Sequence, residues 1–354
     1  MRVIVGLLVG LLVIAPGVAF AAGALDERVT ALEERLSDSF LGQVDISGVV
    51  EVEAGYSSDY DDVKEGDVDL TNLELGLDIA PVDYLTGFIL LKWEEDGGEG
   101  VFVDEGGITL GNLEEGGLAL TAGKLYVPFG VYETGLISDP LTLELGETRE
   151  GAVAVDFASG GFYASLYVFN SAVNDDDEDD TIDAFGASAG YALEAESMGA
   201  DFSIGYISNM TSSGGFSDAL DEAGVDVLDE YTAGMTASAV VSAGAFTLIG
   251  EYLTALDNDY LVGQDEEPAA WNLELGYGFD LSGHAASLSV AYQGTDEAAY
   301  LGLPETRLAA AFGYEIIEGV GVAFEVAHDE DYDLADGGTD ESADRVTCQL
   351  ALEF

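Results

Sequence analysis

The sequence is poor in the residues that build disulfides and basic surfaces. Cys348 is the single cysteine, so no internal disulfide can form. Lys and Arg together number 9 against 70 Asp and Glu, which gives a formal net charge of −61. That charge excludes nucleic acid as a natural partner, because the phosphate backbone would be repelled.

Residues for catalysis are also scarce. The chain has 2 histidines, His284 and His328, and no His-x-x-x-His, Cys-x-x-Cys, P-loop or Gly-x-Ser-x-Gly context. A nucleophile paired with a base is the usual mark of a hydrolase, and no such pair stands out. We therefore expect no enzyme activity, no cofactor and no metal centre.

Long apolar runs are confined to the first residues of the chain. Met1 and Arg2 form a short positive start, an apolar core follows over 3–15, and Ala19-Phe20-Ala21 supplies a small-x-small cleavage pattern. This arrangement predicts a signal peptide over residues 1–21. Because no later run approaches the roughly eighteen apolar residues of a spanning helix, we expect any membrane crossing to use strands.

Acidic chains with few bases are often disordered, but this composition argues otherwise. Hydrophobic residues make up 48% of the chain, with 17 Tyr and 16 Phe among them. The carboxylates must then lie on loops or on the wall of a water-filled lumen. Surface acidity of this degree also occurs as an adaptation to high salt, and the sequence leaves both causes open.

A short heptad pattern precedes the main body of the chain. Leu25, Val29, Leu32 and Leu36 recur at spacings of four, three and four, as in the seam of a coiled coil. Residues 22–40 are therefore predicted to form a short periplasmic coiled-coil helix. It would be either a spacer or part of a small bundle that helps a homo-oligomer to assemble.

From Val44 onward the apolar period changes to two. Apolar residues from Val44 to Tyr56 share one face while Glu51 and Glu53 lie on the other, and similar alternation recurs to the C-terminus. We count roughly sixteen such strands, an even number as bacterial barrels have. The prediction is an all-β protein whose residues 41–354 form a transmembrane antiparallel β-barrel in the bacterial outer membrane.

The connections between these strands alternate in length. Short turns such as Ala243-Gly244 alternate mostly with longer acidic loops, as in barrels with periplasmic turns and extracellular loops. A soluble β-sandwich or propeller would leave this asymmetry unexplained. The last residue, Phe354, continues the apolar row of the final strand. It resembles the signal read by the outer-membrane insertion machinery, which we therefore expect as a partner together with outer-membrane lipid.

One connection is much longer than a hairpin needs. Residues 128–151 follow Val127 with no alternation, and a loop of that length inside a compact domain is usually functional. We predict that it folds into the barrel as a constriction whose charges set the local field. Lys124 shares parity with Leu118 and Leu120, but we expect it to face inward. The predicted pore-lining residues are Lys92, Lys124, Tyr126, Phe129, Tyr132, Glu133, Asp139, Glu144, Glu147, Arg149 and Glu150.

The same region resembles a known family. GKLYVPFG, followed by ETGLISDPLTLELGETRE, is similar to the signature of the LbtU family of siderophore porins, and the likeness spans most of the chain. A looser resemblance, carried by the coiled coil and GKLYVPFG, extends to phosphate-selective porins of the O/P type. Their anion path depends on a ladder of Lys and Arg, which this sequence lacks.

The resemblance implies a function for the barrel. An LbtU-type channel would take up ferric siderophore through the outer membrane without a plug domain. The residues themselves leave two alternatives open: a general, cation-preferring porin for small solutes, and a surface structural or interaction protein whose acidic loops bind ions or neighbouring cells.

Overall fold

The structure is a computed structural model that describes residues 43–94, 100–113, 116–171, 174–175, 182–195, 197–223, 227–228, 231–256 and 267–354. The predicted signal peptide over 1–21 and the predicted coiled-coil helix over 22–40 lie outside these residues. The described residues from Asp45 to Phe354 form one compact unit.

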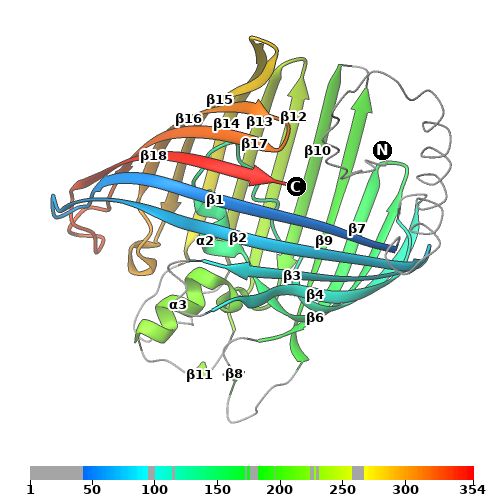
Figure 1. Ribbon diagram of the computed structural model, residues 1–354. Helices are drawn as coiled ribbons and strands as arrows, with labels where there is room; N and C mark the ends of the chain where they lie inside the picture. The colour runs from blue at the N-terminus through cyan, green and yellow to red at the C-terminus, as the bar shows by residue number, and fades with distance from the viewer. Residues whose placement is uncertain are drawn as a thin grey trace, which may run out of the picture. The chain divides into compact units, whose positions relative to one another are not determined.

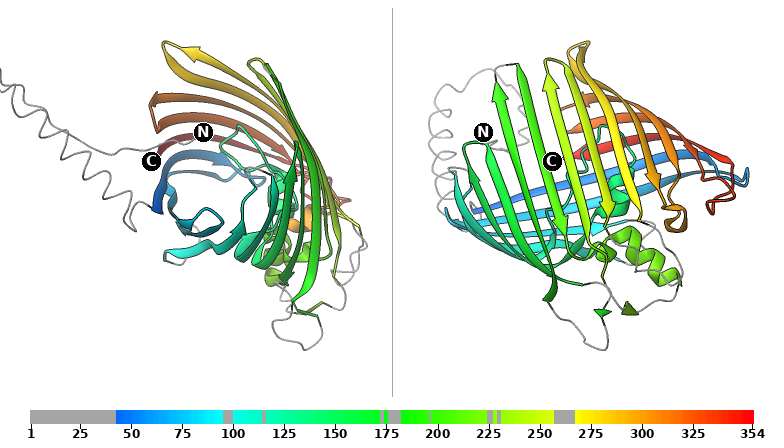
Figure 2. Two further views of the ribbon diagram at one scale, coloured as in Figure 1. Left: turned by 90° about the vertical axis from the view of Figure 1, so that its right-hand side faces the viewer. Right: turned by 180° about the vertical axis from the view of Figure 1, so that it is seen from behind.

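In this part of the chain sixteen strands close into an antiparallel barrel (Figure 1). The strands run obliquely around the wall (Figure 2). They are β1 Val44–Ser58, β2 Lys64–Val82, β3 Leu85–Trp93, β4 Phe102–Gly111, β5 Gly117–Tyr126, β6 Arg149–Ser159, β7 Phe162–Asn170, β9 Ile182–Ala195, β10 Met198–Ile207, β12 Gly234–Ala243, β13 Phe246–Ala255, β14 Ala269–Leu281, β15 His284–Asp296, β16 Thr306–Ile317, β17 Val320–Glu330 and β18 Ser342–Glu353. The predicted barrel and its strand number are confirmed.

The barrel closes where the first strand meets the last. β1 pairs with β18 in a register that sets Val50 opposite Leu352 and Glu51 opposite Ala351. The last residue adds two backbone hydrogen bonds, because Phe354 and Gly48 exchange N–H to carbonyl contacts at 3.0 and 3.1 Å. The apolar rows of the two strands therefore share the outer face, as their alternation predicts.

The outer wall is apolar and carries aromatic residues toward both ends. On β14, Leu273 and Leu275 are each 51% exposed, whereas Glu274 between them is 1% exposed. Trp271 packs on Tyr292 at one end of this row, and Phe246 packs on Tyr277 at the other. An apolar band between aromatic girdles is the outer surface that a lipid bilayer requires.

The connections confirm the predicted asymmetry. Two-residue turns such as Gly160-Gly161 join strands at one end, and longer segments join them at the other. The longer segments carry helix α2 Leu141–Gly146, helix α3 Gly214–Ala223, the 3-10 turns η2 Met210–Ser212 and η3 Ala299–Leu301, and the two-residue strands β8 Asn174–Asp175 and β11 Val227–Leu228. None of the helices in the described ranges is long and apolar enough to cross a membrane.

Candidate functional site

The segment between β5 and β6 runs inside the barrel. We call residues 127–148 the inner segment; it includes α2, which lies within the ring of strands in Figure 1. Its two ends are tied by a hydrogen bond from the Val127 N–H to the Thr148 carbonyl, at 2.9 Å. Everything between them follows the inner wall and is held there by side chains of the later strands.

Two glutamates hold the first half of the inner segment. Glu251 of β13 accepts hydrogen bonds from the Val131 and Tyr132 N–H groups at 2.8 and 3.1 Å. Glu274 of β14 accepts from the Thr134 hydroxyl at 2.7 Å and from the Gly135 N–H at 2.8 Å. These contacts supply acceptors to three backbone N–H groups that have no strand partner, so they fix the backbone of the segment.

The next strands continue the attachment. Glu325 of β17 accepts from the N–H and the hydroxyl of Ser138, at 3.1 and 2.7 Å, and also from the Ile137 N–H. Gln293 of β15 accepts from the Leu141 N–H at 3.1 Å, and Arg307 of β16 donates to the Asp139 carbonyl at 3.4 Å. Consecutive strands from β13 to β17 thus each supply one polar side chain that binds the segment.

Apolar contacts also fasten the segment to the wall. Phe129, Leu141 and Leu145 are buried in one cluster with wall residues such as Phe169 and Leu253. Gly205 of β10 is required here, because a Cβ at that position would overlap the carbonyl oxygen of Phe129. The buried core of the barrel therefore lies between the inner segment and the wall.

Two residues predicted to line the pore belong to this packing instead. Phe129 is 3% exposed and sits in the buried cluster. Tyr132 packs against that cluster, with its hydroxyl directed toward Gly146. Phe129 faces the wall and Tyr132 folds back against Gly130 and Gly146 of the segment itself, which corrects the expectation for both aromatics.

The acidic residues of the segment lie on its open face. Glu133 and Asp139 are exposed, and Glu144 and Glu147 are partly exposed. Although the surface of Asp139 is open, the protein that surrounds it inside the barrel desolvates its carboxyl group and raises its pKa, and Lys92 partly offsets the rise. Burial and then the Asp139 charge raise the pKa of Glu147 to about 7, again opposed by Lys92. Lys92 of β3, 2.8 Å from Glu94, is therefore close enough to act on both acids.

The bases around the inner segment are paired. Arg149 at the start of β6 forms an ion pair with buried Asp104 of β4, and its Nη1 lies 3.5 Å from the Tyr126 hydroxyl. Arg307 binds Asp329 at 2.9 Å and Glu144 at 3.3 Å. These pairs cancel most of the positive charge near the segment.

Lys124 lies on the other face of its strand from the one we expected. It is exposed and alternates with outward Leu118 and Leu120, whereas Leu125 is buried on the inner side. Strand β5 has regular pairing with β6 past this point, so no bulge reverses its parity. Glu150, which pairs with Leu125, is half-buried at the inner face.

Further carboxylates line the lumen away from the inner segment. Glu51 and Glu74 both accept hydrogen bonds from the Asn72 amide, at 3.1 and 3.2 Å. Glu53 accepts from the Gln349 amide at 3.0 Å. Because amides and not bases hold these groups, their negative charge is left for the lumen.

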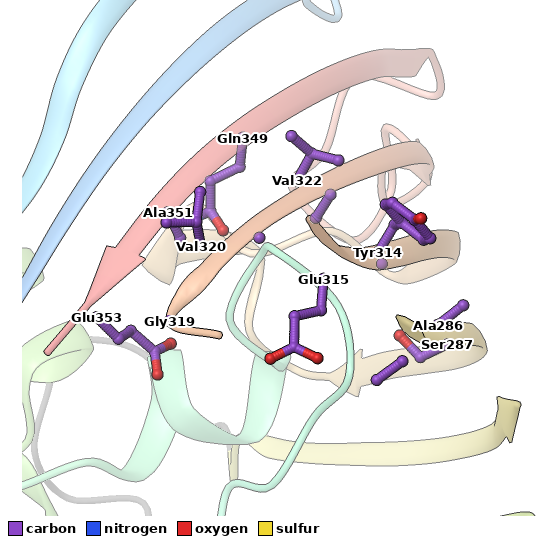
Figure 3. Close-up of a pocket in the computed structure, with 14 residues that line it drawn as sticks. Ala286, Ser287, Tyr314, Glu315, Gly319, Val320, Val322, Gln349, Ala351 and Glu353 are labelled. Carbon is purple, nitrogen blue, oxygen red and sulfur yellow. The ribbon is translucent and has the colours of Figure 1, made fainter. Parts of the chain in front are cut away.

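Two cavities lie near opposite ends of the strands. The one at the short-turn end measures about 390 Å³ and is lined by β15 to β18; Figure 3 shows Glu315 and Glu353 pointing to the same side of these strands. The one at the long-loop end measures about 640 Å³ and is lined by Asp296, Glu297 and Glu305 among others. Each of these two cavities is therefore lined in part by carboxylates.

The residues that hold the inner segment were not among those predicted. Glu251, Glu325 and Gln293 each occupy an inward position of a predicted strand, where an acid or amide looks like any solvated lumen residue. The available signal was that one polar side chain recurs at inward positions of neighbouring strands. That pattern does not reveal that these side chains all bind the same segment.

Comparisons with known proteins agree with this geometry. No family model matches the chain. The chain is 26% identical over 345 residues to a UPF0422 protein of Coxiella burnetii, covering 92% of this chain and 72% of that protein. It is 25% identical over 358 residues to a UPF0422 protein of Legionella pneumophila strain Lens, covering 88% of this chain but 66% of the relative.

Solved structures share the fold at low sequence identity. OprB of Pseudomonas putida matches with a TM-score of 0.64 and 11% identity, covering 92% of this chain and 97% of that one. The fold is that of an outer-membrane porin. The anion-selective porin of Comamonas acidovorans has a TM-score of 0.60 at 14% identity, covering 88% and 99%. The DcaP channel of Acinetobacter baumannii has 0.59 at 14%, covering 88% and 97%.

The porin fold agrees with the apolar outer wall described above. A closed sixteen-strand barrel with such a wall belongs in the bacterial outer membrane, as expected.

Proposed function

We propose that the protein is a passive outer-membrane channel for small solutes that prefers cations. The observation that carries the proposal is the inner segment, which narrows the lumen and presents Glu133, Asp139 and Glu147 on its open face. A passage lined by one sign of charge concentrates counter-ions, and this passage is lined mostly by carboxylates.

The pairing of the bases supports the sign of this preference. Lys92, Arg149 and Arg307 each bind a carboxylate. An anion would therefore meet neutralised cations and unneutralised acids. The described part of the lumen offers no equivalent of the Lys and Arg ladder on which phosphate-selective porins depend.

The finer prediction, uptake of ferric siderophore, rests on the resemblance to LbtU-type porins. In this lumen the cargo would have to be a neutral or cationic chelate, because an anionic one would be repelled. Growth of a deletion strain on single iron sources, with and without the restored gene, tests that narrower proposal.

The reversal potential under a KCl gradient tests the channel itself. We expect cation preference at low salt that weakens as salt rises, since screening acts over roughly 8–10 Å at ordinary ionic strength. Neutralising Glu133 and Asp139 should reduce the preference, whereas Lys124→Gln, on the outer face, should leave it unchanged. Anion preference in the wild-type channel would overturn the proposal.

A further inference from the structure

Three of the longer connections meet at the end of α2. The Gly214 N–H at the start of α3 donates to the Glu147 carbonyl at 3.0 Å. Gly215 is required at this contact, because a Cβ there would overlap the carbonyl oxygen of Glu144. Turn η3, in the connection between β15 and β16, lies beside α3. Two connections at the long-loop end are therefore gathered against the inner segment.

These three elements surround a cavity of about 570 Å³. Part of its lining is apolar and comes from Leu143 of α2, Ala219 of α3, Leu301 of η3 and Leu303. Leu303 belongs to the buried cluster beneath the inner segment and Leu301 packs against that cluster, so this wall is held in place. A cavity of this size with an apolar wall has the dimensions of a small-molecule site.

The polar part of the lining is acidic. Of its three carboxylates, Glu144 is bound to Arg307 at 3.3 Å. Glu147 and Asp218 form no ion pair and no side-chain hydrogen bond within the described ranges. None of the described residues that line the cavity is Lys or Arg. Two carboxylates without a basic partner thus share a cavity with an apolar wall.

Two bases act on Glu147 from outside the cavity. Lys92 binds Glu94 at 2.8 Å, and Arg149 binds Asp104. Because another carboxylate holds each of these bases, neither takes the place of a cation in the cavity.

We propose that this cavity binds an organic amine, with its ammonium on the carboxylates of Glu147 and Asp218 and its apolar body against Leu301 and Leu303. The carboxylates match the charge of any cation, whereas the apolar wall favours a cation that has apolar surface to bury. The inference rests on the proposed function and deepens it, because it names the class of cation that the channel would select.

Three probes separate the two halves of the site. Phenethylamine carries an ammonium and an apolar ring, ethylamine has the ammonium without the ring, and phenylethanol has the ring without a charge. Each is titrated as a blocker of the K⁺ current in planar bilayers at pH 8, where Glu147 is mostly charged. We expect phenethylamine to block wild type at a concentration about tenfold lower than ethylamine, since burial of the ring adds that much affinity. Phenylethanol should not block in the same range.

Matched variants test each wall of the cavity. Asp218→Asn should weaken block by phenethylamine about fivefold, the worth of a partly exposed ion pair. Leu301→Ala should weaken block by phenethylamine and leave block by ethylamine at its wild-type value. Glu305→Gln neutralises a carboxylate of the neighbouring cavity at the same end and should leave both unchanged. Equal block of wild type by the two amines, or equal loss in Glu305→Gln and Asp218→Asn, would overturn the proposal.

A binding measurement distinguishes failure of this inference from failure of the channel. If the wild-type protein carries no K⁺ current, the proposed function is wrong, and calorimetry on the detergent-solubilised protein still decides the site. There, phenethylamine should bind wild type about fivefold more tightly than Asp218→Asn. Equal binding to the two proteins would reject the amine site, whereas a cation-preferring current without selective block would reject it and leave the channel standing.

Discussion

Glu147 sits on the open face of the inner segment with a pKa raised to about 7 by burial and by Asp139. The carboxyl is therefore mostly neutral at pH 6 and mostly charged at pH 8. Because its folded pKa is above the ordinary 4.5, the stability linked to its neutral form is full below pH 4.5 and is lost as the pH rises through about 7.

Cation preference should consequently increase between pH 6 and pH 8. The measurement is the reversal potential at both pH values, for wild type and for Glu147→Gln. The variant should show a much smaller change over this interval. An equally large change in Glu147→Gln would assign the titration to another group.

Glu325 carries three of the contacts that hold the inner segment. Glu325→Ala would leave the N–H groups of Ile137 and Ser138 without their acceptor, at a cost of about 3 kcal/mol or more in the attachment of the segment. We expect larger and noisier single-channel conductance. Glu315→Ala, which removes an acid from the short-turn end of the lumen, should keep the quiet wild-type current.

At the scale of a strand, β14 shows both faces of the wall. Leu275 pairs with Val290 between the two aromatic groups, near the middle of the apolar band. Leu275→Arg should destabilise the barrel by about 2–4 kcal/mol, measured by reversible unfolding in lipid or detergent.

The control for this change must face the lumen without holding the inner segment. Glu274 is unsuitable, because it binds Thr134 and Gly135. Ser287 of β15 lines the cavity in Figure 3, and Ser287→Arg should alter conductance with little loss of stability. Similar loss of stability in Ser287→Arg and Leu275→Arg would contradict the assignment of the faces.

Strand alternation was readable from the sequence wherever one face meets lipid. The start of β2 was not, since the chain from Lys64 to Asp69 is strand but acidic. Where a strand extends past the membrane, both of its faces meet water, so no row of apolar residues identifies it as a strand. Lys124 was misplaced because composition made an inward cation attractive, although its parity with Leu118 was outward. The glutamates that bind the inner segment were missed because nothing local distinguishes them from solvated acids.

At the scale of the whole molecule, the barrel depends on its closing seam. Phe354 is 60% exposed on the outer face, and its backbone completes the pairing with Gly48. Deleting Phe354 should reduce the amount of assembled barrel several-fold, through loss of two hydrogen bonds and of the terminal aromatic. Heat-modifiable mobility on gels measures the assembled fraction, and Phe354→Tyr is the matched control that should assemble normally.

The predicted homo-oligomer belongs to the same scale. Chemical cross-linking in intact membranes, with and without residues 22–40, would show whether the predicted N-terminal helix joins subunits.

The attachment of the inner segment also has a consequence for the order of events during biogenesis. The N–H groups at Val131, Gly135 and Ile137 precede their glutamate acceptors by 120, 139 and 188 residues. These acceptors are on strands that follow the segment in the chain, so it has no complete attachment until β17 has joined the wall. A newly inserted barrel should therefore pass through a wide, leaky stage. The lumen would narrow last, when the final strands join the wall.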